Sequence, residues 1–227
     1  MLFAPDLLVH VTVTGQLALL MLIEMLWDIP EVEVISANTD GVTVRCPRTR
    51  EAEVVEVTKC WELITEFELE RADYTGLYSR DVNGYVAVKT DGTVKTKGPY
   101  GRGLPLHGNP HGIICADAVV DYLTLGFPIE ETIRACQDVR KFIYARKVTG
   151  GATWKGEEIG RVCRWAYSTK ESESILYKDN GHLVPDTVGA LPLVVLPATI
   201  PEELDRDWYI DRANKMLVEL GVSNAVS

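Results

Sequence analysis

Asp40 is the carboxylate with the most suggestive setting for chemistry in this 227-residue chain. It stands in the run Asn38-Thr39-Asp40-Gly41, between two apolar, alternating segments at 32–37 and 42–46. Because Asn, Asp and Gly tolerate the backbone angles of turns, we predict a hairpin with Asp40 at its tip. A carboxylate on a rigid tip, followed by a glycine, could hold a divalent ion against phosphate oxygens. The alternative is that the four residues serve only the turn.

A second hairpin is predicted from Tyr85 to Lys97, and it ends on two lysines. Lys95 and Lys97 are two residues apart on a strand, so both side chains should lie on the same face and could contact one phosphate strand. Tyr100 follows and offers a flat ring for contact with a sugar or base. The alternative is an exposed edge strand that its lysines protect from pairing.

A basic block lies inside an acidic chain. The formal net charge is −10 overall and −9 for residues 1–75, whereas residues 134–170 carry +6. Clustered Lys and Arg supply the phosphate contacts that hold a nucleic acid. Lys147, Arg161 and Arg164 are therefore candidates for contacts with a DNA backbone. A solvated helix face that balances acidic neighbours is the alternative.

The remaining pattern predicts an α+β fold, in which an antiparallel sheet packs on helices and a mainly helical region follows. The boundaries we expect are 1–104 for the first region, 105–185 for the helical basic region and 186–227 for an extended segment and a last helix. A strand is expected at 67–74. Helices are expected at 14–27, where the side chains are apolar all round and should be buried, and at 51–65, 113–125, 129–146, 157–167 and 207–220.

Cysteine usage and hydropathy bear on where such a chain works. The five cysteines form no CxxC pair, which argues against a disulfide framework and favours a reducing cytoplasm. The most apolar stretch, Gly15 to Ile23, is shorter than the roughly 20 residues that a membrane span needs, so no membrane association is expected.

Read in order, these segments resemble the C-terminal part of a family B DNA polymerase of the tailed-phage and viral type. The run from Thr14 to Leu20 leading into Asn38-Thr39-Asp40-Gly41 is similar to the palm element with the third polymerase motif, usually Tyr-Gly-Asp-Thr-Asp-Ser. Asn38 stands at the first Asp of that motif and Asp40 at the second, which is the metal ligand in the family. The resemblance therefore implies that Asp40 is catalytic and binds Mg²⁺.

Three later segments extend the resemblance. The run Asp81 to Val86, followed by Lys95-Thr96-Lys97-Gly98, resembles the strand and lysine motif that hold the primer terminus. The basic block falls where the thumb would be, and Trp208-Tyr209-Ile210 resembles the C-terminal return of the family. The resemblance thus implies contacts with primer–template DNA and deoxynucleoside triphosphate.

The family also needs a second metal-binding Asp, a fingers helix and an exonuclease, which lie before the segment that begins here. Since one carboxylate cannot hold two metal ions by itself, we expect this chain to be inactive alone and to need an N-terminal polymerase chain that carries those parts. Two other classes stay open. One is a non-catalytic DNA-binding or scaffolding module with a polymerase-like fold, and the other is a metal hydrolase built on Asp40 with Asp73 or Asp81.

Overall fold

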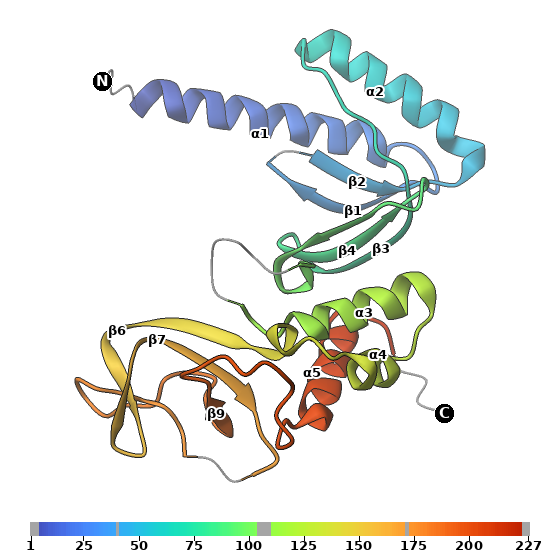
Figure 1. Cartoon of the computed structure of the whole chain (residues 1–227). Helices are drawn as coiled ribbons and strands as arrows, with labels where there is room; N and C mark the ends of the chain where they lie inside the picture. The colour runs from blue at the N-terminus through green and yellow to red at the C-terminus, as the bar shows by residue number, and fades with distance from the viewer. Residues whose placement is uncertain (1–4, 40, 104–109, 171–172, 224–227) are drawn as a thin grey trace. The chain divides into compact units, whose positions relative to one another are not determined.

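The chain forms two compact units, Met1–Asp73 and Tyr74–Ser227, in a computed structural model that describes residues 5–39, 41–103, 110–170 and 173–223 (Figure 1). Each unit combines helices with antiparallel strands, so the predicted α+β class is confirmed. The expected boundaries at 104/105 and 185/186 both fall inside the second unit.

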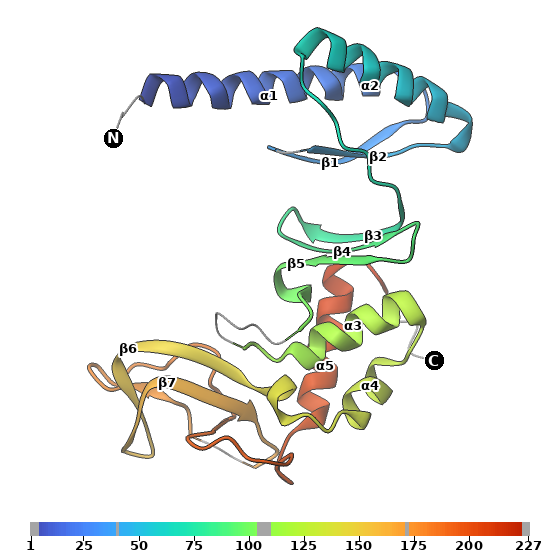
Figure 2. The ribbon, with the colours of Figure 1, turned by 45° about the horizontal axis from the view of Figure 1, so that its top comes forward.

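The first unit packs two helices against one hairpin (Figure 2). Its elements are α1 (Pro5–Trp27), β1 (Glu33–Asn38), β2 (Gly41–Arg45), a short 3-10 turn η1 (Arg48–Arg50) and α2 (Glu51–Thr65). Five buried side chains form its core: Leu22, Leu26, Ile29, Val32 and Trp61. Trp61 Nε1 also donates to the Ala18 carbonyl at 2.7 Å, which joins α2 to α1.

Helix α1 is longer and more exposed than the sequence pattern indicated. It begins at Pro5 rather than at Thr14, and only its C-terminal half enters the core of the first unit. The segment Val9–Trp27 has a mean hydropathy of 1.6 and is 11% buried, so by length and composition it could cross a membrane. The prediction that the most apolar stretch, Gly15 to Ile23, is too short for a membrane span is therefore wrong. Membrane spans, signal sequences and core helices of soluble proteins all share such a composition.

The described residues of the second unit form a three-stranded sheet, three α-helices and a four-stranded sheet. The strands are β3 (Tyr74–Asp81), β4 (Gly84–Lys89) and β5 (Val94–Lys97), in the order β3-β4-β5, followed by the 3-10 turn η2 (Gly98–Tyr100). The predicted strand at 67–74 is wrong because Tyr74 already pairs with Lys89, the last residue of β4. Since β4 ends at Lys89, it has no residue that could pair with the residues before Tyr74.

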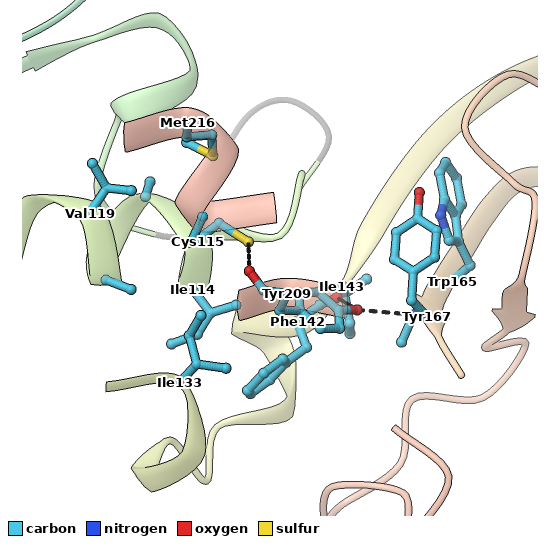
Figure 3. Close-up of a cluster of buried hydrophobic side chains, with 14 of the residues drawn as sticks. Ile114, Cys115, Val119, Ile133, Phe142, Ile143, Trp165, Tyr167, Tyr209 and Met216 are labelled. Atoms are coloured by element: carbon cyan, nitrogen blue, oxygen red, sulfur yellow. Dashed lines mark hydrogen bonds between the residues drawn. The ribbon is translucent and has the colours of Figure 1, made fainter. Parts of the chain in front are cut away.

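Helices α3 (Ile113–Leu125) and α5 (Arg206–Glu219) confirm two predictions, and α4 (Ile129–Ala135) is shorter than expected. These helices pack around Tyr209, which is fully buried (Figure 3). Its hydroxyl donates to the Phe142 carbonyl at 2.7 Å and accepts from the Tyr167 amide at 3.0 Å. Tyr209 thereby ties α5 to η3 (Val139–Phe142) and to the second sheet.

The region from Tyr144 to Tyr167 is a long hairpin, in place of the end of the helix predicted at 129–146 and the whole of the helix predicted at 157–167. Its strands are β6 (Tyr144–Trp154) and β7 (Glu157–Tyr167), and with β8 (Leu176–Tyr177) and β9 (Ala190–Pro192) they form a sheet in the order β8-β6-β7-β9. Helix α4 stops because Cys136 takes an extended backbone conformation. The expectation of a mainly helical 105–185 region is therefore wrong for the part that the structure describes.

Glycines explain why the helical interpretation failed. Gly150 and Gly151 lie between the helices predicted at 129–146 and 157–167, and such a pair is typical of a break between helices. In the structure they lie inside β6 with φ of +82° and +97°, where the register with β7 shifts. Lys155 and Gly156 connect the strands and both have positive φ, at +51° and +81°. Two successive positive-φ residues are typical of the tight turn that matches the twist of a β-hairpin.

Candidate nucleic-acid interface

The hairpin that carries Asp40 forms as predicted. Strands β1 and β2 pair antiparallel from Glu33 opposite Arg45 to Asn38 opposite Gly41. The turn between the two strands therefore lies at the predicted position. Asp40 itself lies outside the described residues, so its side chain has no structural assignment here.

No group of three or more His, Cys, Asp or Glu side chains that could hold a metal occurs within the described ranges. The two carboxylates considered as further ligands are engaged elsewhere. Asp73 accepts from Arg71 Nε at 2.9 Å, and Asp81 accepts from Arg80 Nε at 2.7 Å. Bonding to Arg80 lowers the pKa of Asp81, as does the Asn83 amide. These contacts favour local roles for both side chains.

Lys95 and Lys97 occupy alternate positions of β5, and both are exposed. They lie opposite Ala87 and Tyr85 of β4, which confirms the predicted hairpin and the shared face. The strand ends at Lys97, and at the next residue, Gly98, φ is +67° and an added Cβ would collide with the Asn83 carbonyl oxygen. Glycine is required there because the backbone passes so close to the β3–β4 turn.

Tyr100 is not available for contact with a ligand. Its ring is fully buried, and its hydroxyl donates to the Met216 carbonyl at 3.1 Å. Burial raises the pKa of Tyr100, so the hydroxyl stays protonated. The prediction of a surface ring for sugar or base contact is therefore wrong, because η2 turns Tyr100 into the core beneath α5.

Lys147, Arg161 and Arg164 are exposed on the β6–β7 hairpin. Ala145 lies opposite Arg164 and Lys147 lies opposite Val162, so strand alternation places Lys147 and Arg164 on one face. Arg161 alternates with Val162 and lies on the other face. No ion pair joins any of the three to another residue in the described part of the chain. The structure thus brings two of the three predicted contacts together.

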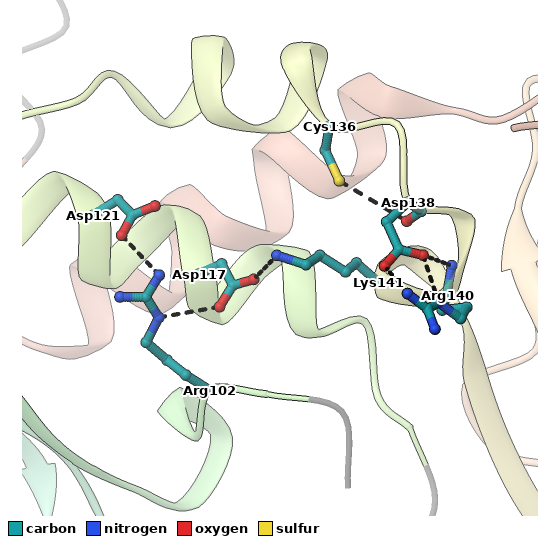
Figure 4. A network of polar contacts seen from close by, with 7 residues as sticks. All are labelled: Arg102, Asp117, Asp121, Cys136, Asp138, Arg140 and Lys141. Carbon is teal, nitrogen blue, oxygen red and sulfur yellow. Dashed lines mark hydrogen bonds and ion pairs between the residues drawn. The ribbon is translucent and has the colours of Figure 1, made fainter.

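Two other cations of the basic block, Arg140 and Lys141, form ion pairs (Figure 4). Lys141 Nζ lies 2.7 Å from buried Asp117, which also accepts from Arg102 Nε at 3.2 Å. The bond with Asp117 raises the pKa of Lys141. Arg140 forms an ion pair with Asp138 at 2.7 Å. These pairs neutralise the helical side of the block and leave its exposed strand cations available.

All five cysteines are free, as the absence of a CxxC pair predicted. Cys115 is buried in α3 and its thiol donates to the Tyr209 carbonyl at 3.6 Å. Burial raises the pKa of Cys115 to about 12, so its thiol is protonated at neutral pH. Cys115 therefore serves packing rather than nucleophilic chemistry.

The sequence did not reveal a cavity of about 620 Å³ between the β6–β7 hairpin and α5, which we call the aromatic cavity. Four of its lining residues are aromatic: Tyr144, Trp165, Tyr167 and Trp208. Trp208 stacks on Tyr167 with ring centroids 3.4 Å apart, and Tyr144 stacks on Trp165 at 6.0 Å. The alternation of Trp165 and Tyr167 on one strand is the signal that could have indicated this aromatic face.

The rim of the aromatic cavity carries charges of both signs. Arg146, Arg212 and Lys215 contribute cations, and Asp186 and Asp211 contribute carboxylates. Arg146 lies 3.2 Å from Asp186, whereas the ion pair of Arg212 with Glu219 is long, at 3.9 Å.

No protein-family model matches this chain, and no curated protein matches it significantly.

Proposed function

We propose that this chain is the C-terminal palm and thumb part of a family B DNA polymerase and acts with a partner chain in template-directed DNA synthesis. The observation that carries the proposal is the β1–β2 hairpin, whose strands meet at Asn38 and Gly41. Asp40 stands at the second Asp of the polymerase motif that this segment resembles, and in the family that Asp binds the metal. The paired strands fix the ends of the turn, as a rigidly presented carboxylate would require.

A second hairpin supports a role beside a primer strand. Lys95 and Lys97 project from one face of β5, at the spacing that the resemblance assigns to the primer-binding lysines. Lys147 and Arg164 add a second pair of exposed cations on β6–β7. Cations arranged in this way contact phosphates without reading base sequence, which suits a polymerase.

Helix α1 supports the need for a partner chain. Its side chains Leu7, Val11 and Leu17 are 60–65% exposed, and Val9 and Leu20 are also exposed. Apolar side chains exposed over a continuous surface commonly mark a protein–protein contact. The proposed occupant is the N-terminal polymerase chain with the exonuclease, the fingers and the other palm motif.

Magnesium fits this proposal only when the partner chain completes the site. The described residues contain no cluster of three metal-ligating side chains, and Asp40 is the only ligand that we assign to this chain. Bound Mg²⁺ would stabilise the charge on the transferred phosphoryl group. The second metal Asp would come from the partner.

Primer extension tests the proposal directly. The chain is assayed with Mg²⁺, alone and after mixing with the protein of the adjacent reading frame, and extension is expected only in the mixture. Asp40→Asn should then reduce extension by about a hundredfold or more, since it removes the carboxylate but keeps a turn-forming residue. Asp91→Asn is the matched control, because Asp91 also precedes a glycine in a hairpin turn. Normal extension by Asp40→Asn would contradict the proposal.

A non-catalytic DNA-binding module is the second candidate. The observation in its favour is a set of five exposed cations on β5, β6 and β7, for which no ion pair occurs within the described residues: Lys95, Lys97, Lys147, Arg161 and Arg164. Binding of DNA that is independent of Mg²⁺, with no extension in either assay, would favour this candidate.

A further inference from the structure

One face of α5 presents an aromatic ring and two cations to the aromatic cavity. Trp208, Arg212 and Lys215 are spaced by four and three residues, so they lie on neighbouring turns of the same helix face. All three line the cavity, together with Tyr144 of β6. Trp208 is held edge-on to Tyr144 with centroids 5.9 Å apart, and it stacks on Tyr167. The ring is therefore fixed beside the two cations.

The charges at the rim favour an anionic ligand on the α5 side. The carboxylate of Asp186 lies 3.2 Å from Arg146 and so neutralises that cation. The other two cations that line the cavity, Arg212 and Lys215, belong to α5. Arg212 has only a 3.9 Å ion pair with Glu219, and Lys215 has none with another described residue. Asp211 can accept hydrogen bonds from an exocyclic amino group or a sugar hydroxyl.

The dimensions and the chemistry of the lining match a nucleotide. A volume of about 620 Å³ lies within the usual range for small-molecule sites. An aromatic ring beside an Arg and a Lys is the combination by which proteins hold unpaired nucleotides, through stacking on the base and charge contacts with the phosphate. Duplex DNA would not offer an unstacked base to such a cavity.

We infer that the aromatic cavity binds one unpaired nucleotide of single-stranded DNA, with its base at Trp208 and its phosphate at Arg212 and Lys215. This inference rests on the proposed function for its choice of DNA as the ligand. It adds a single-strand contact to the phosphate contacts proposed for Lys147 and Arg164. Those two residues lie on one face of the β6–β7 hairpin, and Arg146, which lines the cavity, lies on the other face.

The test measures binding of the full chain to fluorescently labelled oligo(dT) of about 12 nucleotides and to an abasic strand of equal length. Wild type is expected to bind oligo(dT) about tenfold more tightly than the abasic strand, because only the first offers bases for stacking. Lys215→Glu should weaken binding of oligo(dT) by about tenfold or more. Lys170→Glu, an exposed lysine that does not line the cavity, is the matched control and should bind more tightly than Lys215→Glu.

Three outcomes would overturn the inference. Equal affinity for oligo(dT) and the abasic strand would exclude base stacking, and equal affinities of Lys215→Glu and Lys170→Glu would exclude the α5 cations. Competition by free dTMP as effective as that by oligo(dT), per nucleotide, would identify a free-nucleotide site instead of a strand site.

The result is separable from that of the primer-extension assay. Base-dependent binding that Lys215→Glu weakens would support the aromatic cavity even if no mixture extends a primer. Extension without base-dependent binding would support the proposed polymerase and overturn the cavity assignment alone.

Discussion

The two compact units bury their apolar side chains to different extents. The first unit has five buried core residues, whereas the core of the second unit has 28. The first unit also exposes the N-terminal half of α1, with Leu7 at 65% and Val11 at 64%. Since burial of apolar surface is the main stabilising term in folding, the second unit contains a large core of its own, whereas the first leaves much of its apolar surface exposed.

Truncating a large side chain in each unit should give the largest contrast. Phe142 is fully buried in the second unit, and Leu63 of α2 is 84% exposed in the first. Phe142→Ala should lower the free energy of unfolding by about 3–5 kcal/mol, because it removes buried apolar contacts and leaves a cavity. Leu63→Ala should change it by less than about 0.5 kcal/mol. Denaturant titration measures both, and similar losses would contradict the contrast in packing.

Hydrogen exchange on the intact chain would sharpen the same comparison. Helix α3 is buried from Ile113 to Val120, whereas the α1 residues Val9 to Thr14 are exposed. Local opening of α1 should require less free energy, so its amides should exchange at least about 100-fold faster than those of α3.

Addition of the proposed partner chain should slow exchange in α1 and leave α3 unchanged. Slow exchange in α1 without a partner would show that the first unit is complete by itself, and would remove the argument from exposed apolar surface.

The sequence predicted those elements whose signals are local. The first hairpin has its turn residues at Asn38–Gly41, and α3 ends at Gly126, whose φ of +73° suits the end of a helix. The β6–β7 hairpin was missed because the Gly150-Gly151 pair was interpreted as a break between elements. It is an irregularity within one strand, and the turn signal is at Lys155-Gly156.

The candidate site was predictable only in part, for a related reason. Exposure of Lys95 follows from strand alternation, which is local. The burial of Tyr100 under Met216, 116 residues later, and the pairing of Lys141 with Asp117, 24 residues earlier, depend on tertiary contacts. The aromatic cavity likewise joins β6 and β7 to α5, and no window of sequence contains that juxtaposition.

Removal of exposed cations should weaken DNA binding when they belong to the second unit and not when they belong to the first. Replacing Lys147 and Arg164 together by Ala removes two exposed cations from one face of β6–β7. Binding of duplex DNA should weaken about tenfold near 50 mM salt, and the slope of log K against log salt should become shallower by up to about 2. The matched control replaces Arg48 and Lys59, two exposed cations of the first unit. If the control lowers affinity and slope as much, the basic strands are not the DNA-binding surface.

The smallest expected effect concerns one carboxylate of the second unit. Bonding to Arg140 lowers the pKa of Asp138, which also accepts from the Arg140 amide at 3.0 Å and caps η3. A lowered pKa in the folded state contributes stability that is present above the unfolded pKa of about 3.9 and is lost as the pH falls through the folded pKa. Asp138→Asn should therefore lower the free energy of unfolding by no more than about 1 kcal/mol at pH 7.

That difference from wild type should shrink as the pH falls below about 4, because the wild-type carboxyl then becomes protonated. Denaturant titrations at pH 7 and near pH 3 measure it. A difference that stays constant with pH would mean that Asp138 acts through the neutral cap hydrogen bond, which Asn also provides less well, and not through its charge on Arg140.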